Sequence, residues 1–288
     1  MSVASFDFST LYTNIPHNKL LKVLNELVDF CFKGGGKEFI QVKQFGAVWT
    51  DDNNQANIFS KSSLKNSIKY LLDNCYFKFG NKIFKQVIGI PMGSDPAPFM
   101  ANLFLYYYEN KWILSMKKHN LRHARMFSNT FRYLDDLIAI NDGNLFEKYH
   151  REIYPPELEL KKENDGLKET SFLDLEISVS DNKTFLVKPY DKRDSFPFSI
   201  VRMPFLCSNI PSKIFYSSMG AEILRMARTT NQKSAFLLSS KRLINRMVNQ
   251  GANINSVMKT LKKTFGRHFS IFHKFASNSH VFVNELLN

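Results

Sequence analysis

Two adjacent carboxylates, Asp135 and Asp136, stand between apolar, strand-forming stretches in the segment Phe-Arg-Tyr-Leu-Asp-Asp-Leu-Ile-Ala-Ile at residues 131–140. The pattern predicts a strand, a tight turn and a strand, which puts both aspartates at the tip of a hairpin. Because like charges repel, such a pair needs either a bound divalent cation or full solvation. Aspartate is also a common turn residue, so a solvated turn is the ordinary alternative.

A second acidic strand end lies near the start of the chain. Asp7 closes a short apolar run, and a turn and a helical pattern follow it. Three aspartates from adjacent strands are the kind of ligands that Mg²⁺ takes in proteins, with water and substrate phosphates completing its shell. Two such ions, about 3.5–4 Å apart, activate a hydroxyl and stabilise the leaving oxygen in phosphoryl transfer. These residues therefore predict a nucleotidyl-transfer site.

The chain carries three motifs in order: Asp7 with Tyr12 five residues later, Gly-Ile-Pro-Met-Gly-Ser at 89–94 and Tyr-Leu-Asp-Asp at 133–136. These motifs resemble those of reverse transcriptases. The motif sequences are similar to those of Penelope-like retroelement polymerases, in particular Phe-Asp-Phe-Ser-Thr-Leu-Tyr-Thr-Asn-Ile-Pro at 6–16, Ala-Asn-Leu-Phe at 101–104 and Ser-Phe-Leu-Asp-Leu at 171–175. The likeness extends over most of the chain, from about residue 6 to about residue 275.

This resemblance implies an α+β fold and an RNA-directed DNA polymerase of a retrotransposon. A right-hand polymerase palm, an antiparallel sheet with helices on one face, is expected over residues 1–190 with partial fingers insertions. A basic, all-helical thumb is expected over 191–275, followed by a short tail at 276–288. Few residues precede Asp7, so the fingers strands that usually come before this motif are expected to be largely missing.

The resemblance also implies the catalytic roles. Asp7 and Asp135 are expected to bind two Mg²⁺ ions, which Mn²⁺ can replace, with Asp136 as a weaker or supporting ligand. The backbone carbonyl of Phe8 adds an oxygen. A primer 3′-hydroxyl would attack the α-phosphorus of a deoxynucleoside triphosphate, so catalysis is mainly positioning and charge stabilisation. Lys161 or its neighbour Lys162 would supply a cation near the pyrophosphate leaving group.

The resemblance assigns further residues to the incoming nucleotide. The ring of Tyr12 would lie under the deoxyribose and clash with a 2′-hydroxyl, which favours DNA synthesis. Pro91, Met92 and Gly93 would contact the template base and the nucleotide, since glycine permits a close approach of the backbone. Asp95 is expected to cap the helix that starts at Pro96. The apolar positions of that helix are expected to lie in the core: Phe99, Leu103, Tyr106 and Tyr107.

Charge indicates a polyanionic partner. The net charge is +13, and between Arg202 and Lys274 thirteen basic residues stand against one acid, Glu222. Lysine and arginine on one surface gain affinity by releasing counterions from nucleic acid, whereas solvated helix faces usually mix both signs. Residues expected to bind an RNA template and a DNA primer are Phe172 and Leu173 of a predicted primer-grip hairpin, Arg225, Arg228, Lys241, Arg242, Arg246, Lys262 and Lys263.

The apolar periodicity predicts the remaining elements. Helices are expected at 19–32, 62–74, 96–112, 212–228, 232–250 and 255–265, the last two stopped by Gly251 and Gly266. Gly80-Asn81 is expected to join 76–79 to 82–87 as a hairpin. The three glycines at 34–36 are expected to be a flexible connector, because they lack the context of a phosphate-binding loop.

Composition is that of a folded chain. Of 288 residues, 44% are hydrophobic, and no apolar run approaches the roughly 20 residues of a membrane-spanning helix. An intracellular, nuclear protein is expected, with Cys31, Cys75 and Cys207 as buried free thiols. Two other functions stay open: a catalytically inactive, truncated nucleic-acid-binding remnant, and an RNA-copying RNA polymerase that prefers ribonucleotides despite Tyr12.

Overall fold

The structure, a computed structural model, describes residues 1–198, 200–201 and 203–287. Contacts between residues divide the chain into two compact units, one of residues 6–163 and one that combines residues 1–5 with those from 164 onward. This division differs from the expected boundary at residue 190. The reason is local: Val3 N donates to the Leu167 carbonyl at 2.9 Å, and Asn164 Nδ2 donates to the Val3 carbonyl at 3.1 Å.

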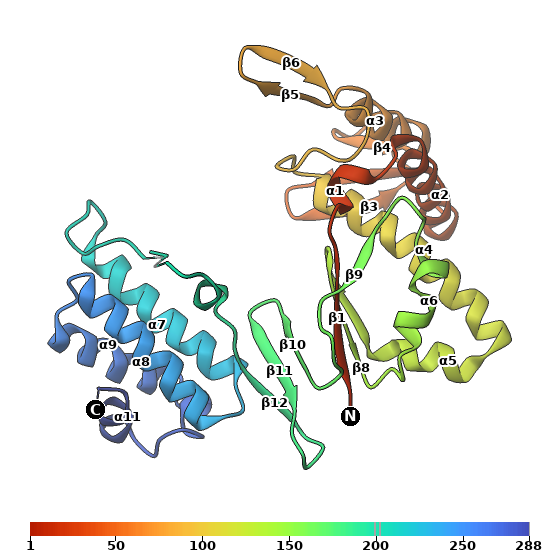
Figure 1. The fold of residues 1–288 in the computed structure, drawn as a ribbon. Coiled ribbons are helices and arrows are strands. Elements are labelled where there is room, and N and C mark those ends of the chain that lie inside the picture. The colour runs from red at the N-terminus through yellow and green to blue at the C-terminus, as the bar shows by residue number, and fades with distance from the viewer. Residues whose placement is uncertain (199, 202, 288) are drawn as a thin grey trace. The chain divides into compact units, whose positions relative to one another are not determined.

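A four-stranded sheet forms the centre of the first unit. Its order is β7 (Thr130–Tyr133), β8 (Asp136–Ile140), β1 (Val3–Phe8) and β9 (Leu160–Lys162), so β1 lies between β8 and β9 (Figure 1). In this sheet β7 pairs with β8, and β1 pairs with β9, in antiparallel orientation. Successive residues of a strand face opposite sides of a sheet. Phe6 and Phe8 therefore share one face, and Asp7 faces the other.

Helices cover the face of the sheet that carries Phe6 and Phe8. The ring of Phe146, in α6 (Leu145–Ile153), packs edge-on against Phe6 with 4.8 Å between the ring centroids. Tyr154, just after α6, packs on Phe8 in the same way, also at 4.8 Å. The remaining helices of the unit are α1 (Leu11–Asn14), α2 (His17–Gly35), α3 (Lys61–Asp73), α4 (Ala97–His119), α5 (Leu121–Met126) and the 3-10 turn η1 (Phe127–Asn129).

Between β1 and α4 the chain forms two small antiparallel sheets beside α2 and α3. One has the order β3 (Gly46–Thr50), β2 (Phe39–Lys43) and β4 (Ile58–Ser60); the other is the hairpin of β5 (Tyr76–Phe79) and β6 (Lys82–Lys85). The predicted helices at 19–32 and 62–74 and the hairpin at Gly80-Asn81 are confirmed as α2, α3 and β5–β6.

The glycines at 34–36 are not a flexible connector. Gly34 and Gly35 belong to the last turn of α2, and Gly36 ends the helix with φ +60, a left-handed conformation that glycine adopts at little cost. A Cβ atom at Gly35 would stand 2.6 Å from the ring of Trp49. Glycine at this position therefore lets β3 lie against the end of the helix.

Helix α4 confirms the predicted helix but runs on to His119. Pro96 occupies its N-cap position, so Asp95 is not the capping residue that we expected. The expected core positions are also wrong in part, because the side chains of Phe99, Leu103 and Tyr106 are 74%, 42% and 50% exposed. The buried residues of α4 are instead Ala97, Met100, Ala101, Phe104 and Leu105.

The second unit has a three-stranded antiparallel sheet followed by helices. The strands are β10 (Glu169–Phe172), β11 (Leu175–Val179) and β12 (Phe185–Pro189), in that order. After the 3-10 turn η2 (Lys192–Ser195) come α7 (Ser212–Thr229), α8 (Lys233–Asn249), α9 (Ile254–Arg267), α10 (Phe269–Phe272) and α11 (Ser279–Leu287). The three long helices match the predicted ones, although Gly266 lies inside α9 and does not stop it.

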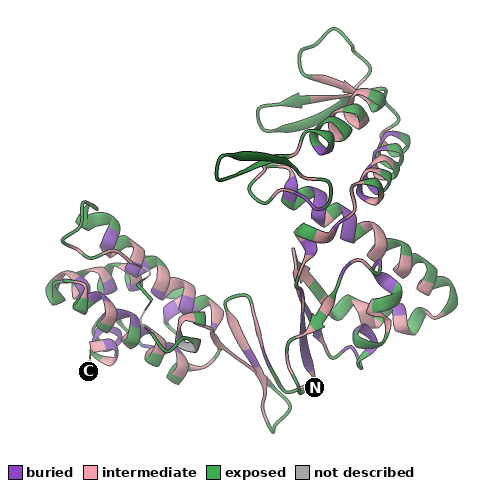
Figure 2. Ribbon diagram, turned by 45° about the horizontal axis from the view of Figure 1, so that its top comes forward, coloured by how far each residue is buried: buried purple, intermediate pink, exposed green. Residues whose placement is uncertain are grey.

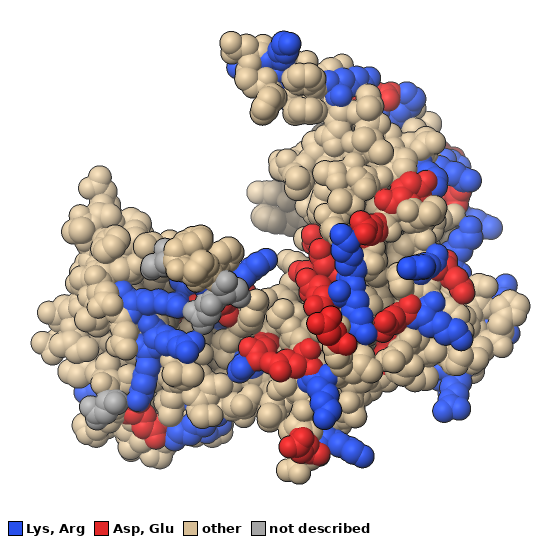
Figure 3. Space-filling view, viewed as in Figure 1, with Lys and Arg blue, Asp and Glu red and all other residues tan. Residues whose placement is uncertain are grey.

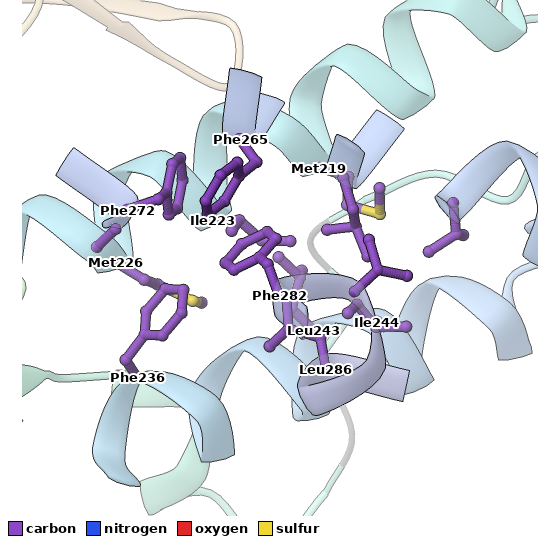
Figure 4. Close-up of a cluster of buried hydrophobic side chains, with 14 of the residues drawn as sticks. Met219, Ile223, Met226, Phe236, Leu243, Ile244, Phe265, Phe272, Phe282 and Leu286 are labelled. Atoms are coloured by element: carbon purple, nitrogen blue, oxygen red, sulfur yellow. The ribbon is translucent and has the colours of Figure 1, made fainter. Parts of the chain in front are cut away.

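Aromatic rings from several helices form the core of the helical region (Figure 4). Phe236 of α8 stacks on Phe275 with 4.2 Å between the centroids. Phe282 of α11 lies 5.1 Å from Phe265 and 4.9 Å from Phe272, and it is fully buried. The expected short tail at 276–288 thus contributes a helix to this core, because three of its apolar residues face inward.

Burial differs from expectation at the cysteines as well. Cys31 and Cys207 are exposed and Cys75 is partly buried. Figure 2 shows where buried residues lie within each unit. Within the described ranges of the chain, no helix is both long enough and apolar enough to cross a membrane.

Candidate active site

The two acidic motifs meet at one end of the four-stranded sheet. The backbone N–H of Phe8 donates to the carbonyl of Asp135 at 3.2 Å. Asp7, the residue before Phe8, therefore lies beside the turn that carries Asp135, although the two are far apart in sequence. Asp136 begins β8 opposite Tyr133. The predicted strand–turn–strand hairpin is confirmed, and it is adjacent to the strand that carries Asp7.

The turn of this hairpin has a strained backbone. Leu134 adopts φ +56, a left-handed conformation that residues other than glycine, asparagine and aspartate seldom adopt. Such conformations cost about 1–3 kcal/mol and persist only where the surroundings enforce them. The turn holds Asp135 at the end of the sheet, so the contacts that keep Leu134 in this conformation also position Asp135.

Arg132 supplies these contacts from beneath the hairpin. Its guanidinium donates to the Leu134 carbonyl at 3.1 Å, to Asn102 Oδ1 at 2.6 Å and to both carboxylate oxygens of Glu109, at 2.6 and 3.1 Å. The Tyr154 hydroxyl donates to the same carboxylate at 2.8 Å. Strand β7 turns Arg132 inward and leaves Phe131 and Tyr133 more than half exposed.

Electrostatics in this buried network are strong. Burial and the Glu109 charge together raise the pKa of Tyr154 well above its ordinary value. Burial alone would lower the pKa of Arg132, but its hydrogen bond to Glu109 and the charge of that residue produce a net rise. Sequence reasoning did not identify Arg132. Its signal was an arginine between two aromatic residues in a strand, where alternation puts it on the buried face.

The strand register separates Lys161 from Lys162. Lys161 lies opposite Asp7 on β9, and residues directly opposite each other in an antiparallel pair share a face. Its side chain is 60% exposed, with Nζ 3.4 Å from Glu159. Lys162 lies opposite Phe6 on the face that α6 covers, and its Nζ contacts Glu147 of α6 at 2.7 Å. Of the two lysines, only Lys161 is on the Asp7 face.

Tyr12 lies close to the acidic end of the sheet. Partial burial, followed by the negative charge of Asp135, raises the pKa of the Tyr12 hydroxyl. The backbone of the same residue anchors the loop before α4, because Ile90 N donates to the Tyr12 carbonyl at 2.6 Å. The predicted nucleotide-binding residues at 12 and 91–93 are thus joined through this contact.

Gly89 packs this loop against the backbone of α1, whereas the predicted contact of Pro91, Met92 and Gly93 with a nucleotide stays a prediction. A Cβ atom at Gly89 would stand 2.5 Å from the Tyr12 carbonyl oxygen, and its φ is +81. Gly89 N also donates to the Ile15 carbonyl at 2.8 Å. Gly93, with φ +97, has open space around its Cβ position, and Met92 is 75% exposed. The loop before α4 therefore approaches α1 closely at Gly89.

The donor chemistry at the sheet end suits a hard cation. Asp7, Asp135 and Asp136 offer carboxylate oxygens, and the Phe8 carbonyl is the adjacent backbone oxygen. Among the residues that the structure describes, no three His, Cys, Asp or Glu side chains are grouped closely enough to hold a metal ion. Mg²⁺ is commonly bound by one or two carboxylates together with water and substrate phosphates, so these oxygens fit it in type.

The second unit repeats the same kind of turn. In the β10–β11 hairpin, Phe172 pairs with Leu175, and Leu173 adopts φ +55 before Asp174. Arg225 of α7 donates to Asp174 Oδ2 at 2.9 Å. A Leu-Asp turn thus stands at the tip of this predicted primer-grip hairpin, and Leu173 is 45% exposed there.

The predicted nucleic-acid-binding bases fall into two groups. Arg225 also pairs with Glu222 at 2.7 Å, and Arg246 Nη1 pairs with Asp191 at 2.8 Å, so both hold the unit together. Together with Arg242 they line a cavity of about 270 Å³. Four others form no ion pair within the described residues, and all except the partly buried Lys241 are exposed: Arg228, Lys241, Lys262 and Lys263. Their contact with nucleic acid stays a prediction.

Comparisons with known proteins show the fold. No protein-family model and no curated protein sequence matches the chain. Telomerase from Candida albicans, solved in complex with a fragment of telomeric RNA, aligns over 99% of this chain and 47% of that chain, with 12% identity and a TM-score of 0.53. Apo telomerase from Candida tropicalis aligns over 98% of this chain and 46% of that chain, with 12% identity and a TM-score of 0.47.

At such identity the likeness is one of fold, and the chain spans about half the length of the telomerases that it matches. The coarse prediction of an α+β fold with antiparallel strands and a C-terminal helical region is confirmed. Over nearly its whole length, the chain has a fold that is similar to part of a telomerase.

Proposed function

We propose that the chain is the palm and thumb of an RNA-directed DNA polymerase from a Penelope-like retroelement. The observation that carries the proposal is the Phe8–Asp135 backbone hydrogen bond, which brings two acidic motifs to one sheet end. The fold likeness to telomerase, a reverse transcriptase, supports the polymerase class. The Penelope-like assignment rests on the sequence resemblance at 6–16, 101–104 and 171–175.

Asp7 and Asp135 would hold two Mg²⁺ ions, with Asp136 and the Phe8 carbonyl in support. When bound, these ions make the primer 3′-hydroxyl a better nucleophile and neutralise charge on the phosphates. The chain itself contributes position: β1 fixes Asp7, and Arg132 holds the strained turn that carries Asp135. The reaction is nucleotidyl transfer to the primer 3′-hydroxyl.

Lys161 would act on the pyrophosphate side of the nucleotide. Its ammonium group is exposed on the Asp7 face, where it can stabilise the charge that develops on the leaving group or donate a proton to it. Lys162 lies on the covered face, where its ammonium group contacts Glu147, and this favours Lys161 for the role.

Tyr12 would select deoxynucleotides, since it lies near Asp135 and is anchored to the loop of Pro91, Met92 and Gly93. A ring under the sugar leaves no room for a 2′-hydroxyl. The turn at Phe172 and Leu173 would contact the primer, and Arg228, Lys262 and Lys263 would contact the phosphates of the template and primer. Arg225 would hold the Leu173-Asp174 turn in place.

Primer extension tests the proposal. The full chain is given an RNA template annealed to a DNA primer, with deoxynucleotides and Mg²⁺. Asp135→Ala should lower extension about a thousandfold, which corresponds to about 4 kcal/mol of transition-state stabilisation. Asp181→Ala, at an exposed turn of the second unit, is the matched control and should extend normally. Extension that survives Asp135→Ala would reject the catalytic assignment, and salt-sensitive duplex binding without any extension by the unaltered chain would favour the inactive remnant.

A further inference from the structure

The β5–β6 hairpin presents an unusual amount of apolar surface to solvent. Every residue of both strands is exposed, as the colouring of Figure 2 shows. Phe79 is 77% exposed and Ile83 is 74% exposed, whereas aromatic and branched side chains in strands normally pack against something. A two-stranded hairpin is marginally stable alone, and an apolar patch of this kind marks an interaction site.

The register mixes rings and ammonium groups on both faces of the hairpin. On one face Phe77 stacks on Phe84, with 5.5 Å between centroids and 19° between the ring planes, and Phe79 lies opposite Lys82. On the other face Tyr76 lies opposite Lys85, and Lys78 opposite Ile83. Each face therefore offers flat aromatic surface next to positive charge.

The charge of the hairpin is of one sign. From residue 74 to residue 94 the sequence contains Lys78, Lys82 and Lys85 and no acid. The nearest acid is Asp73, whose pKa is lowered first by a hydrogen bond from Lys69 and to a smaller extent by the charge of Lys85. Lys78 and Lys82, near the tip, form no ion pair with any described residue. In Figure 3 the hairpin likewise shows basic and no acidic side chains on the drawn face.

This combination favours one kind of occupant. A protein partner that covered the rings would also bury three ammonium groups, which is costly unless it brings matching acids. Single-stranded nucleic acid satisfies both features at once, because bases stack on aromatic rings while phosphates meet the lysines. Every base has a flat face, so such contacts tolerate any sequence.

We propose that the β5–β6 hairpin binds single-stranded nucleic acid, with bases stacked on Phe79 and on the Phe77–Phe84 pair and phosphates contacting Lys78 and Lys82. This inference deepens the proposed function. The identification of the bound single strand as the unpaired template rests on that function. Binding itself needs neither Asp135 nor catalysis, so it can be measured separately.

Fluorescence anisotropy of the full chain with labelled oligouridine and oligothymidine tests the hairpin. Phe79→Ala should weaken binding about tenfold, the loss of one stacked base, and Phe79→Trp should restore it. Phe45→Ala is the matched control, since Phe45 is 93% exposed at the tip of the other hairpin, β2–β3. Comparison of the two oligonucleotides shows whether RNA or DNA is preferred.

The lysines give an independent readout. Affinity for nucleic acid falls as salt rises. Lys78→Ala and Lys82→Ala should each make the plot of log affinity against log salt less steep by about 0.7, as expected for the loss of one phosphate contact on a single strand. Equal affinity of Phe79→Ala and the unaltered chain, or an equal loss in Phe45→Ala, would overturn the proposal. So would self-association through the hairpin, seen in sedimentation as a dimer that Phe79→Ala dissociates.

The two proposals fail in different ways. Asp135→Ala should bind the single strand as tightly as the unaltered chain. If Asp135→Ala retains primer extension while Phe79→Ala loses single-strand binding, the polymerase assignment fails and the hairpin assignment stands. The reverse pattern, loss of extension in Asp135→Ala with no effect of Phe79→Ala on binding, rejects the hairpin alone.

Discussion

Lys161 and Lys162 are neighbours in sequence, yet strand β9 sends their side chains to opposite faces of the sheet. Lys161 stands opposite Asp7 and Lys162 opposite Phe6. The sequence alone left the two equivalent, because alternation assigns faces only when the partner strand and its register are known. The register is a tertiary property, and it selects Lys161 as the residue on the acidic face.

Exchange of each lysine for alanine distinguishes them. Lys161→Ala should lower the rate of nucleotide incorporation about a hundredfold, because the leaving pyrophosphate loses a nearby proton donor. Lys162→Ala breaks only the contact with Glu147 and should leave the rate close to that of the unaltered chain. Single-turnover incorporation measures both. Equal rates in the two variants would show that neither lysine serves the leaving group.

Arg132 is a positioning residue, and its removal should lower the free energy of unfolding. Arg132→Met leaves the Glu109 carboxylate without its main partner and should lower the free energy of unfolding by about 2 kcal/mol. This loss is smaller than for a fully buried ion pair, because Glu109 is partly exposed. Arg132→Lys should not restore the fork of contacts to Glu109, Asn102 and Leu134. Denaturant unfolding measures the free energy, with the exposed Arg125→Met as control. A loss no larger than that of the control would contradict the assigned role.

Sequence reasoning at this scale succeeded where a motif is local. The turn at Asp135 and the strand end at Asp7 follow from residue order and alternation. Arg132 was missed because its partners, Asn102 and Glu109, come from α4 and lie 30 and 23 residues earlier in the sequence. The ion pairs of Arg225 with Asp174 and of Arg246 with Asp191 were missed for the same reason, because a basic residue in a sequence does not reveal a remote acidic partner.

Elements were predictable in type but less so in exposure. The helices at 62–74 and 212–228 agree closely with α3 and α7. In α4 the apolar residues surround the helix, so periodicity could not tell which face is buried, and Phe99 and Tyr106 proved exposed. The glycines at 34–36 looked like a linker because local composition does not show that Trp49 approaches Gly35.

Asp191 joins η2 to α8 and makes the stability of the second unit pH-dependent. Its pKa is held well below the ordinary value of 3.8, first by the hydrogen bond from Arg193 and also by that from Arg246. The ionised form therefore stabilises the fold above about pH 4, and this stabilisation is lost as pH falls through the depressed folded pKa. Asp191→Ala should cost about 1 kcal/mol at neutral pH.

Denaturant unfolding at several pH values checks this linkage. The difference in unfolding free energy between the unaltered chain and Asp191→Ala should be constant above about pH 5 and should narrow below pH 4. A difference that stays unchanged down to pH 3 would mean that the Asp191 ion pairs do not stabilise the fold.

On the scale of the molecule, the last residues belong to the helical core. Phe282 is fully buried among Phe236, Phe265 and Phe272. Phe282→Ala should therefore lower the free energy of unfolding by about 3–5 kcal/mol, whereas Val281→Ala, at a partly exposed neighbour, should cost far less. Chemical unfolding compares the two. Similar small losses would mean that α11 does not contribute to the core.

The division of the chain into units could not be predicted from composition. A shift from mixed to basic, helical sequence suggested a boundary at 190, but strands β10–β12 group with the helices and with residues 1–5. Contacts between distant segments, such as the hydrogen bonds of Val3 with Leu167 and Asn164, decide such boundaries, and neither charge nor periodicity reports them. The family resemblance of the ordered motifs, by contrast, implied an α+β fold with a C-terminal helical region, which the structure has and which is similar to part of a telomerase.

The central claim is that Asp7 and Asp135 form one catalytic site. The most direct test is single-turnover incorporation of one deoxynucleotide by Asp7→Ala, Asp135→Ala and the double variant, in Mg²⁺. Residues that act as a unit are strongly non-additive, so each single variant should lose about a thousandfold and the double variant should lose no more. Near-normal incorporation by Asp7→Ala, or losses that multiply in the double variant, would contradict a shared site.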